Sequence, residues 1–133
     1  MKKVLFLCVA NSTRSQLAEG LARHLWEGKA KVMSAGSKPT QLNPLAVKVL
    51  AEEGIDISHH RAKSVREMNL DGVDLVITLC KEEICPSLPV QVEHLQWPID
   101  DPAKIGTEDE AEALAAFRQA RDSIAKHIKA LEI

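Results

Sequence analysis

A run of four apolar residues, Val4 to Leu7, ends at Cys8, and a short polar stretch then leads into a helical pattern that begins at Ser15. An apolar run without alternation is typical of a strand that is buried on both faces of a parallel sheet. A strand, a short loop and a helix in this order bring the loop amides and the helix N-terminus to one small volume. This unit favours an α/β fold and predicts a tetrahedral-oxyanion site beside a thiol.

The rest of the chain alternates predicted strands with predicted helices, which favours right-handed crossovers and a parallel sheet covered on both faces. We therefore expect one α/β domain over residues 1–133, with three αβα layers. The strands are predicted over residues 3–8, 31–34, 74–80 and 92–97. The helices are predicted over residues 15–26, from Asn43-Pro44 to Gly54, from Ser64 to Met68 or Leu70, and from a cap at Thr107 onward.

The composition excludes several classes of protein. A formal net charge of -2 over 133 residues gives no basic surface for nucleic acid. No apolar run approaches the roughly 20 residues that cross a bilayer, and the first residues lack a signal-peptide pattern. Three cysteines cannot form a static disulfide framework, so we expect free or redox-active thiols. The prediction is a cytoplasmic monomer without cofactor, membrane partner or nucleic-acid partner.

Each polar residue of the Cys8–Ser15 stretch suits an anion site. The helix dipole, the loop amides and Arg14 would favour the thiolate form of Cys8. The Arg14 guanidinium offers a planar fork of donors to a phosphate-like anion. Ser15 can donate a hydrogen bond to the sulfur, and Asn11 tolerates a left-handed backbone that would shape the loop. The alternative is that Cys8 only packs as a small apolar residue at the end of a strand.

Two further reactive positions follow predicted strands and should lie at the same rim, where α/β sheets bind their ligands. Cys80 ends the third predicted strand, and Asp100-Asp101 follows the fourth. Asp101 precedes Pro102, which favours extended backbone and would direct its carboxyl group toward the rim. A carboxylic acid there could protonate a leaving oxygen, although two adjacent aspartates are more often a solvated turn.

With these residues the chain resembles the low-molecular-weight protein tyrosine phosphatases and the thioredoxin-coupled arsenate reductases that share their fold. The resemblance covers nearly the whole chain and implies a four-stranded parallel sheet. The residues that carry it are Cys-x5-Arg-Ser at Cys8–Ser15, its continuation Gln16-Leu17-Ala18-Glu19-Gly20, Ser34-Ala35-Gly36, Asn43-Pro44, Gly54-Ile55-Asp56-Ile57-Ser58, the strand to Cys80, and Asp101-Pro102.

The resemblance implies roles for these residues. Cys8 attacks the substrate, Asp101 is the general acid, and the oxygens of arsenate or a phosphate-like anion are bound by the stretch Val9, Ala10, Asn11, Ser12, Thr13, Arg14 and Ser15. Similar arsenate reductases carry a cysteine pair after the third strand. By that resemblance Cys80 attacks the Cys8 adduct, Cys85 then attacks Cys80, and thioredoxin reduces the resulting Cys80–Cys85 disulfide.

The spacing Cys80-x4-Cys85 is shorter than is common in that family. The shorter loop could change the external reductant from thioredoxin to a glutaredoxin/glutathione system. Two alternatives are a pair of unrelated thiols and a zinc site, for which the spacing is suitable. The histidines form no ligand motif, and His59 and His60 are expected at the surface or at a helix cap, so we predict no metal site. The candidate histidines for such a zinc site are His59, His60 and His94.

Phosphotyrosine or phosphate-ester hydrolysis is the main alternative function. Phosphatases of this family usually carry aromatic residues after Asp-Pro, whereas Ala103 to Gly106 supplies none, and the chain has no tyrosine. They also tend to carry a second cysteine where this chain has Thr13. A third hypothesis is an oxyanion-binding or redox-sensing module without turnover. The resemblance and the cysteines together favour an arsenate reductase.

Some relatives bind potassium beside the loop through Asn, Glu, Ser and a downstream carboxylate. Asn11, Glu19 and Ser34 match the first three, but the downstream stretch, Arg61 to Lys63, is basic. We therefore predict no potassium site and expect Lys63 or Arg61 to occupy that position near Glu19. The alternative is that both are solvated surface charges.

Overall fold

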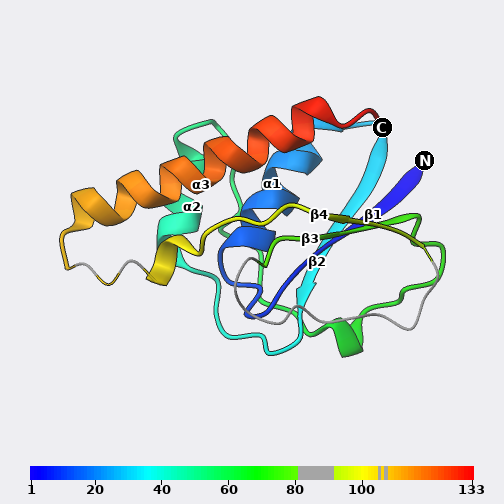
Figure 1. Ribbon diagram of the computed structural model, residues 1–133, viewed down its shortest axis with the longest axis horizontal. Helices are drawn as coiled ribbons and strands as arrows, with labels where there is room; N and C mark the ends of the chain where they lie inside the picture. The colour runs from blue at the N-terminus through cyan, green and yellow to red at the C-terminus, as the bar shows by residue number, and fades with distance from the viewer. Residues whose placement is uncertain (81–91, 105, 107) are drawn as a thin grey trace.

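The computed structural model describes residues 1–80, 92–104, 106 and 108–133 and shows a four-stranded parallel sheet (Figure 1). The strands lie in the order β2-β1-β3-β4, so the strand that leads to Cys8 is central. Their bounds are β1 Lys2–Cys8, β2 Ala30–Gly36, β3 Leu75–Thr78 and β4 Glu93–Gln96. The predicted α/β class and parallel sheet are confirmed. Strand β3 is shorter than predicted, because regular pairing ends at Thr78.

Three α-helices and two 3-10 helices complete the described fold. They are α1 Arg14–Leu25, α2 Pro44–Ala51, η1 Val65–Glu67, η2 Pro102–Lys104 and α3 Glu110–Ala130. Asn43 caps α2 as predicted, by accepting a hydrogen bond from the Leu45 amide. Thr107 was predicted to cap the last helix and lies outside the described residues. The cap of α3 is Asp109, whose side chain accepts from the Ala111 amide at 2.9 Å.

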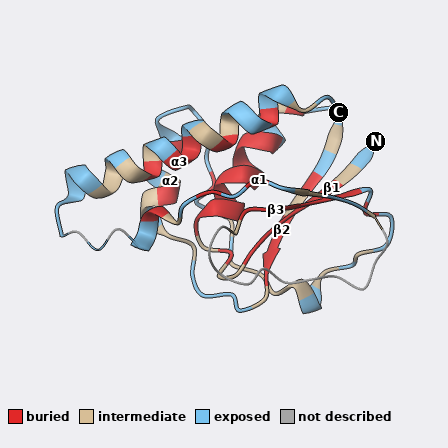
Figure 2. Cartoon of the chain, in the orientation of Figure 1, coloured by how far each residue is buried: buried red, intermediate tan, exposed pale blue. Residues whose placement is uncertain are grey.

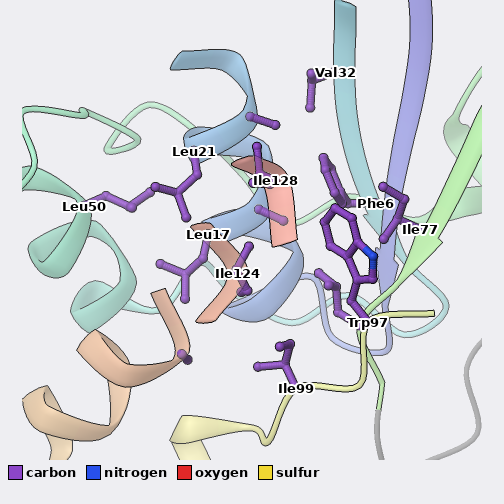
Figure 3. Close-up of a cluster of buried hydrophobic side chains, with 14 of the residues drawn as sticks. Phe6, Leu17, Leu21, Val32, Leu50, Ile77, Trp97, Ile99, Ile124 and Ile128 are labelled. Carbon is purple, nitrogen blue, oxygen red and sulfur yellow. The ribbon is translucent and has the colours of Figure 1, made fainter. Parts of the chain in front are cut away.

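The larger core lies between one face of the sheet and the three α-helices (Figure 3). Val4 and Phe6 point to this face from β1, as their alternation requires. The first half of α1 is buried throughout, because the helix packs against both the sheet and α3 (Figure 2). The remaining members of this core include Leu17, Leu21, Val32, Leu50, Ile77, Trp97, Ile99, Phe117, Ile124 and Ile128.

A smaller core covers the opposite face of the sheet. Leu5 and Leu7 point to this face and pack with Ala35, Val73 and Val76. Side chains from η1 and from the segment before β3 contribute to the cluster. No helix in the described part of the chain is long and apolar enough to cross a membrane.

A buried arginine interrupts the apolar stripe of α3. Arg121 is 8% exposed and donates through Nη1 to the Val49 carbonyl and to Glu52, at 2.9 Å each. Glu52 also receives hydrogen bonds from Arg118, which are the main reason that its pKa lies at about 2. This polar cluster joins α3 to the end of α2.

Candidate active site

The loop between β1 and α1 is held from behind by the segment that follows β2. The carbonyls of Val9, Ala10 and Ser12 accept hydrogen bonds from backbone amides of residues 38, 40 and 43, at 2.9–3.0 Å. In a trans peptide the N–H points opposite to the C=O. The amides that follow these carbonyls therefore point away from that segment, toward the volume in front of the loop.

Gly36 makes this close packing possible. A Cβ atom on Gly36 would lie 2.3 Å from the Val9 carbonyl oxygen and 3.0 Å from the Asn11 nitrogen. The end of β2 therefore approaches the loop backbone as closely as only glycine permits.

The sulfur of Cys8 lies at the centre of the loop and is almost fully buried. Ser15 Oγ lies 2.8 Å from Sγ, and the Asn11 amide donates to Sγ at 3.2 Å. Ser15 Oγ also accepts a hydrogen bond from the Asn11 side-chain amide at 2.7 Å, which leaves its own hydrogen for the sulfur. The predicted serine–sulfur contact is therefore present. Two hydrogen-bond donors are therefore directed at the sulfur.

Asn11 has a positive φ of 48° and is the one non-glycine residue with this geometry in the described chain. Its side chain makes four hydrogen bonds that hold the strained backbone in place. Nδ2 donates to Ser15 and Ser34, while Oδ1 accepts from the Gln16 side chain and the Lys63 amide. This is the left-handed backbone that asparagine tolerates better than most residues.

The N-terminus of α1 faces the same volume. The N-cap residue, Thr13, makes no side-chain capping hydrogen bond, and the first turn contains no acidic residue. The first regular backbone bond runs from the Leu17 amide to the Thr13 carbonyl. The preceding amides of the first turn have no acceptor within the helix, so this end carries a partial positive charge that suits an anion.

Arg14 joins the loop to the segments that follow β3 and β4. Its Nη1 donates to the Leu79 carbonyl at 3.3 Å and to the Ile99 carbonyl at 3.0 Å. Its Nη2 lies 3.8 Å from Oδ2 of Asp101. The residue is 4% exposed. These two carbonyls hold the guanidinium in one orientation.

Asp101 lies at the rim beside Arg14, as predicted. Its other carboxyl oxygen, Oδ1, accepts from the Ala103 amide at 3.0 Å at the start of η2. This contact orients the carboxyl group, and its side chain is 19% exposed. Asp100 is exposed. The structure therefore places the Asp101 carboxyl group beside the Arg14 guanidinium.

Cys80 follows β3 on the side of the sheet that carries Cys8. Leu7 pairs with Thr78, and the Leu79 amide donates to the Leu7 carbonyl at 2.9 Å, so the two cysteines leave adjacent strands at the same rim. Cys80 is half-buried. Cys85, the second member of the predicted redox pair, lies outside the described residues.

A buried carboxylate stands behind the loop. Glu19 is 2% exposed and accepts a hydrogen bond from Ser34. Lys63 Nζ lies 3.4 Å from Glu19 Oε1, whereas Arg61 pairs with Glu67 at 2.8 Å. Of the two cations expected near Glu19, Lys63 occupies that position. No group of three or more metal-binding side chains is found among the residues that the structure describes.

Sequence reasoning missed two residues behind the loop. Gln16 is fully buried, and its side chain contacts both Asn11 and His60. The expectation that His60 lies at the surface or at a helix cap is wrong, because its side chain is 7% exposed and contacts Gln16 and Glu19 of α1. On the helix, Gln16 shares a face with Glu19 and Arg23, opposite the predicted apolar stripe, so the sequence pattern gave no signal that it is buried. No local pattern identifies His60, which is 44 residues away.

Comparison with known proteins extends this picture. Residues 3–132 match the family described as low molecular weight phosphotyrosine protein phosphatase. An arsenate reductase of Halalkalibacterium halodurans is 43% identical over 130 residues, which cover 96% of this chain and 93% of that protein.

Solved structures of arsenate reductases are similar to this chain over nearly its whole length. One, described as an arsenate reductase in the phosphate binding state, has a TM-score of 0.83 and 34% identity, with 97% of this chain and 95% of that chain covered. The thioredoxin-dependent arsenate reductase of Corynebacterium glutamicum has a TM-score of 0.67 and 30% identity, with 97% of this chain and 62% of that chain covered.

Proposed function

This chain belongs to the low molecular weight phosphotyrosine protein phosphatase family, a family of enzymes, and we propose that it acts within that family as an arsenate reductase. The observation that carries the proposal is the buried Cys8 sulfur, which receives two donors at an uncapped helix N-terminus beside Arg14. The similarity to arsenate reductases over 96% of the chain supports the choice of substrate.

In the proposed first step the Cys8 thiolate attacks the arsenic atom of arsenate. The amides of the loop and the Arg14 guanidinium bind the remaining oxygens. Asp101, in its protonated form, gives a proton to the departing oxygen, which leaves as water. The product is a covalent Cys8 thiol–arsenic adduct, still at the oxidation level of arsenate.

The second and third steps carry the oxidation to the other two cysteines. The Cys80 thiolate attacks the Cys8 sulfur, the sulfur–arsenic bond breaks, and its electron pair leaves with arsenic as arsenite. Cys85 then attacks Cys80 and releases Cys8 as a thiolate, with Cys80 and Cys85 joined in a disulfide. The position of Cys80 at the same rim as Cys8 supports this order.

An external dithiol must supply two electrons to return the Cys80–Cys85 disulfide to thiols. We propose thioredoxin as that partner, because a similar protein is described as thioredoxin-dependent. Glutaredoxin with glutathione is the alternative reductant that the short spacing suggests.

Hydrolysis of a phosphate ester is the second candidate, since the matched family is described as a phosphatase. The aromatic residues argue against an aryl substrate. The chain contains two phenylalanines, two tryptophans and no tyrosine, and all four are buried in the larger core. No aromatic side chain is therefore left to line a slot for a phosphotyrosine ring.

The test is arsenate-dependent oxidation of NADPH by the purified protein with either thioredoxin and thioredoxin reductase or glutaredoxin and glutathione. We expect turnover with the thioredoxin pair, and none when Cys80 is replaced by Ser. Hydrolysis of an aryl phosphate is measured in parallel. Phosphatase activity that survives Cys80→Ser, with no arsenate turnover under either reductant, would establish the phosphatase instead.

A further inference from the structure

The side chain of Gln16 forms a polar contact between α1 and the nucleophile loop. Its Nε2 lies 3.1 Å from Asn11 Oδ1, 3.3 Å from the Asn11 carbonyl and 2.9 Å from the Arg61 carbonyl. All three neighbours are oxygen acceptors, so the nitrogen of the amide must face them. The amide oxygen of Gln16 is therefore directed to the other side, where His60 lies.

His60 fixes the orientation of this amide. Its Nδ1 lies 3.0 Å from Gln16 Oε1 and 3.6 Å from Glu19 Oε2. Both partners accept hydrogen bonds, so Nδ1 must carry the hydrogen in the neutral ring as well as in the cation. Burial lowers the pKa of His60, although Glu19 opposes this, while His59, Arg23 and Lys63 act with burial. The donor toward Gln16 is thus present in both protonation states.

These contacts lead to the sulfur through Asn11. Gln16 holds both the side-chain oxygen and the backbone carbonyl of Asn11, the residue at positive φ. Asn11 also donates its backbone amide to Cys8 Sγ at 3.2 Å and its side-chain nitrogen to Ser15 Oγ. A rotation of Asn11 would therefore weaken both hydrogen bonds to the Cys8 sulfur.

We propose that Gln16 and His60 are positioning residues for the nucleophile, which hold Asn11 in its left-handed conformation and so keep two hydrogen-bond donors on the Cys8 sulfur. The Gln16 side chain contacts Asn11, and the His60 ring contacts the Gln16 side chain. The inference deepens the proposed function, because it concerns the thiolate that begins the reaction.

The test measures the alkylation of Cys8 by iodoacetamide as a function of pH, in a Cys80→Ser, Cys85→Ser background where Cys8 is the sole thiol. Gln16→Met keeps the length of the side chain and removes its donors and acceptor. We expect its alkylation profile to shift to higher pH, with a rate about tenfold lower near pH 6, as expected for weakened hydrogen bonds to a thiolate. The same change in exposed Gln119 is the control and should leave the profile unchanged.

Two variants of His60 distinguish the loss of its hydrogen-bond donor from the loss of its ring. His60→Asn places an amide nitrogen near the position of Nδ1 and should preserve the alkylation profile, whereas His60→Leu should shift it in the direction of Gln16→Met. His24→Leu, at an exposed histidine of α1, is the matched control. Thermal unfolding of each variant verifies that the chain is folded.

An unchanged profile in folded Gln16→Met and His60→Leu would overturn the proposal. Equal shifts in His60→Asn and His60→Leu would also overturn it, because they would show that the ring only fills space. Alkylation needs no arsenate, so this result is independent of whether the protein reduces arsenate.

Discussion

The N-termini of α1 and α3 differ in how their first backbone amides are capped. Each helix begins with backbone amides that have no acceptor within the helix. In α3 the Asp109 side chain accepts one of them, and Glu110 and Glu112 stand in the first turn. In α1 the cap residue Thr13 accepts none, and no acidic residue follows.

The capped N-terminus of α3 stabilises its own helix, whereas the uncapped N-terminus of α1 is available to a ligand. The N-terminus of α3 is exposed and neutralised by its own carboxylates. The N-terminus of α1 is buried, and the residue that opens it is an arginine oriented by two carbonyls. The positive potential at this buried helix end favours the binding of an anion, and the Cys8 sulfur lies beside the helix end.

The largest effect should come from the arginine that distinguishes α1. Arg14→Lys keeps the charge and loses the planar fork, so we expect kcat for arsenate reduction to fall by roughly 10²–10³. Steady-state kinetics with thioredoxin measure the loss. Arg66→Lys, an exposed position, should retain full activity. Near-normal kcat in Arg14→Lys would show that charge alone is sufficient at this site.

A carboxylate placed at the cap of α1 should make this end resemble that of α3. We expect Thr13→Asp to weaken the inhibition by phosphate roughly 10- to 100-fold, because the new side chain competes for the same amides and repels the anion. Thr13→Asn is the matched neutral control and should weaken inhibition less. If both variants bind phosphate like the unmodified protein, the amides of this end do not hold the anion.

The converse change removes the cap from α3. Asp109→Ala should lower the free energy of unfolding by about 1 kcal/mol, the usual cost of losing an N-cap side chain. Urea unfolding followed by circular dichroism gives this value. Phosphate inhibition should be unchanged. A change in anion affinity here would contradict the division between the two helix ends.

The smallest effect concerns the polar cluster that attaches α3 to α2. Hydrogen bonds from Arg118 hold the pKa of Glu52 at about 2, below its ordinary 4.5, so its charged form stabilises the fold above pH 4.5. That contribution is lost as the pH falls from 4.5 toward 2. Glu52→Gln should therefore melt slightly below the unmodified protein at neutral pH, and the difference should shrink across that range. Glu27→Gln, at an exposed position, is the control. A melting-temperature difference that does not vary with pH would contradict this account.

The parts of the site that sequence reasoning anticipated are local in the chain. Cys8, Asn11 and Ser15 lie between the end of β1 and the first turn of α1, and their spacing after a buried strand constrains how they meet. The position of Asp101 also followed from its place after a strand and before Pro102. Such inferences work because the carboxyl ends of parallel strands share one rim.

The missed contacts depend on approaches between distant segments. The Asn11 side chain binds the Lys63 amide, Arg14 reaches the carbonyls of Leu79 and Ile99, and neither is encoded in a local pattern. The burial of Arg121 was missed because a charged residue is expected to be solvated. Its partners, the Val49 carbonyl and Glu52, lie at the end of another helix and are not evident from the sequence. The cap of α3 was misplaced because Thr107 and Asp109 are both good N-cap residues, and propensity alone does not choose between them.

The proposal that oxidation passes from Cys8 to the other two thiols is tested most directly by counting thiols after one turnover. The fully reduced protein is incubated with arsenate without oxygen or external reductant, quenched with acid and alkylated, and then analysed by peptide mass spectrometry. The account predicts the loss of two thiols per chain, with Cys80 and Cys85 linked and Cys8 alkylated. Retention of all three thiols in the presence of excess arsenate would contradict it.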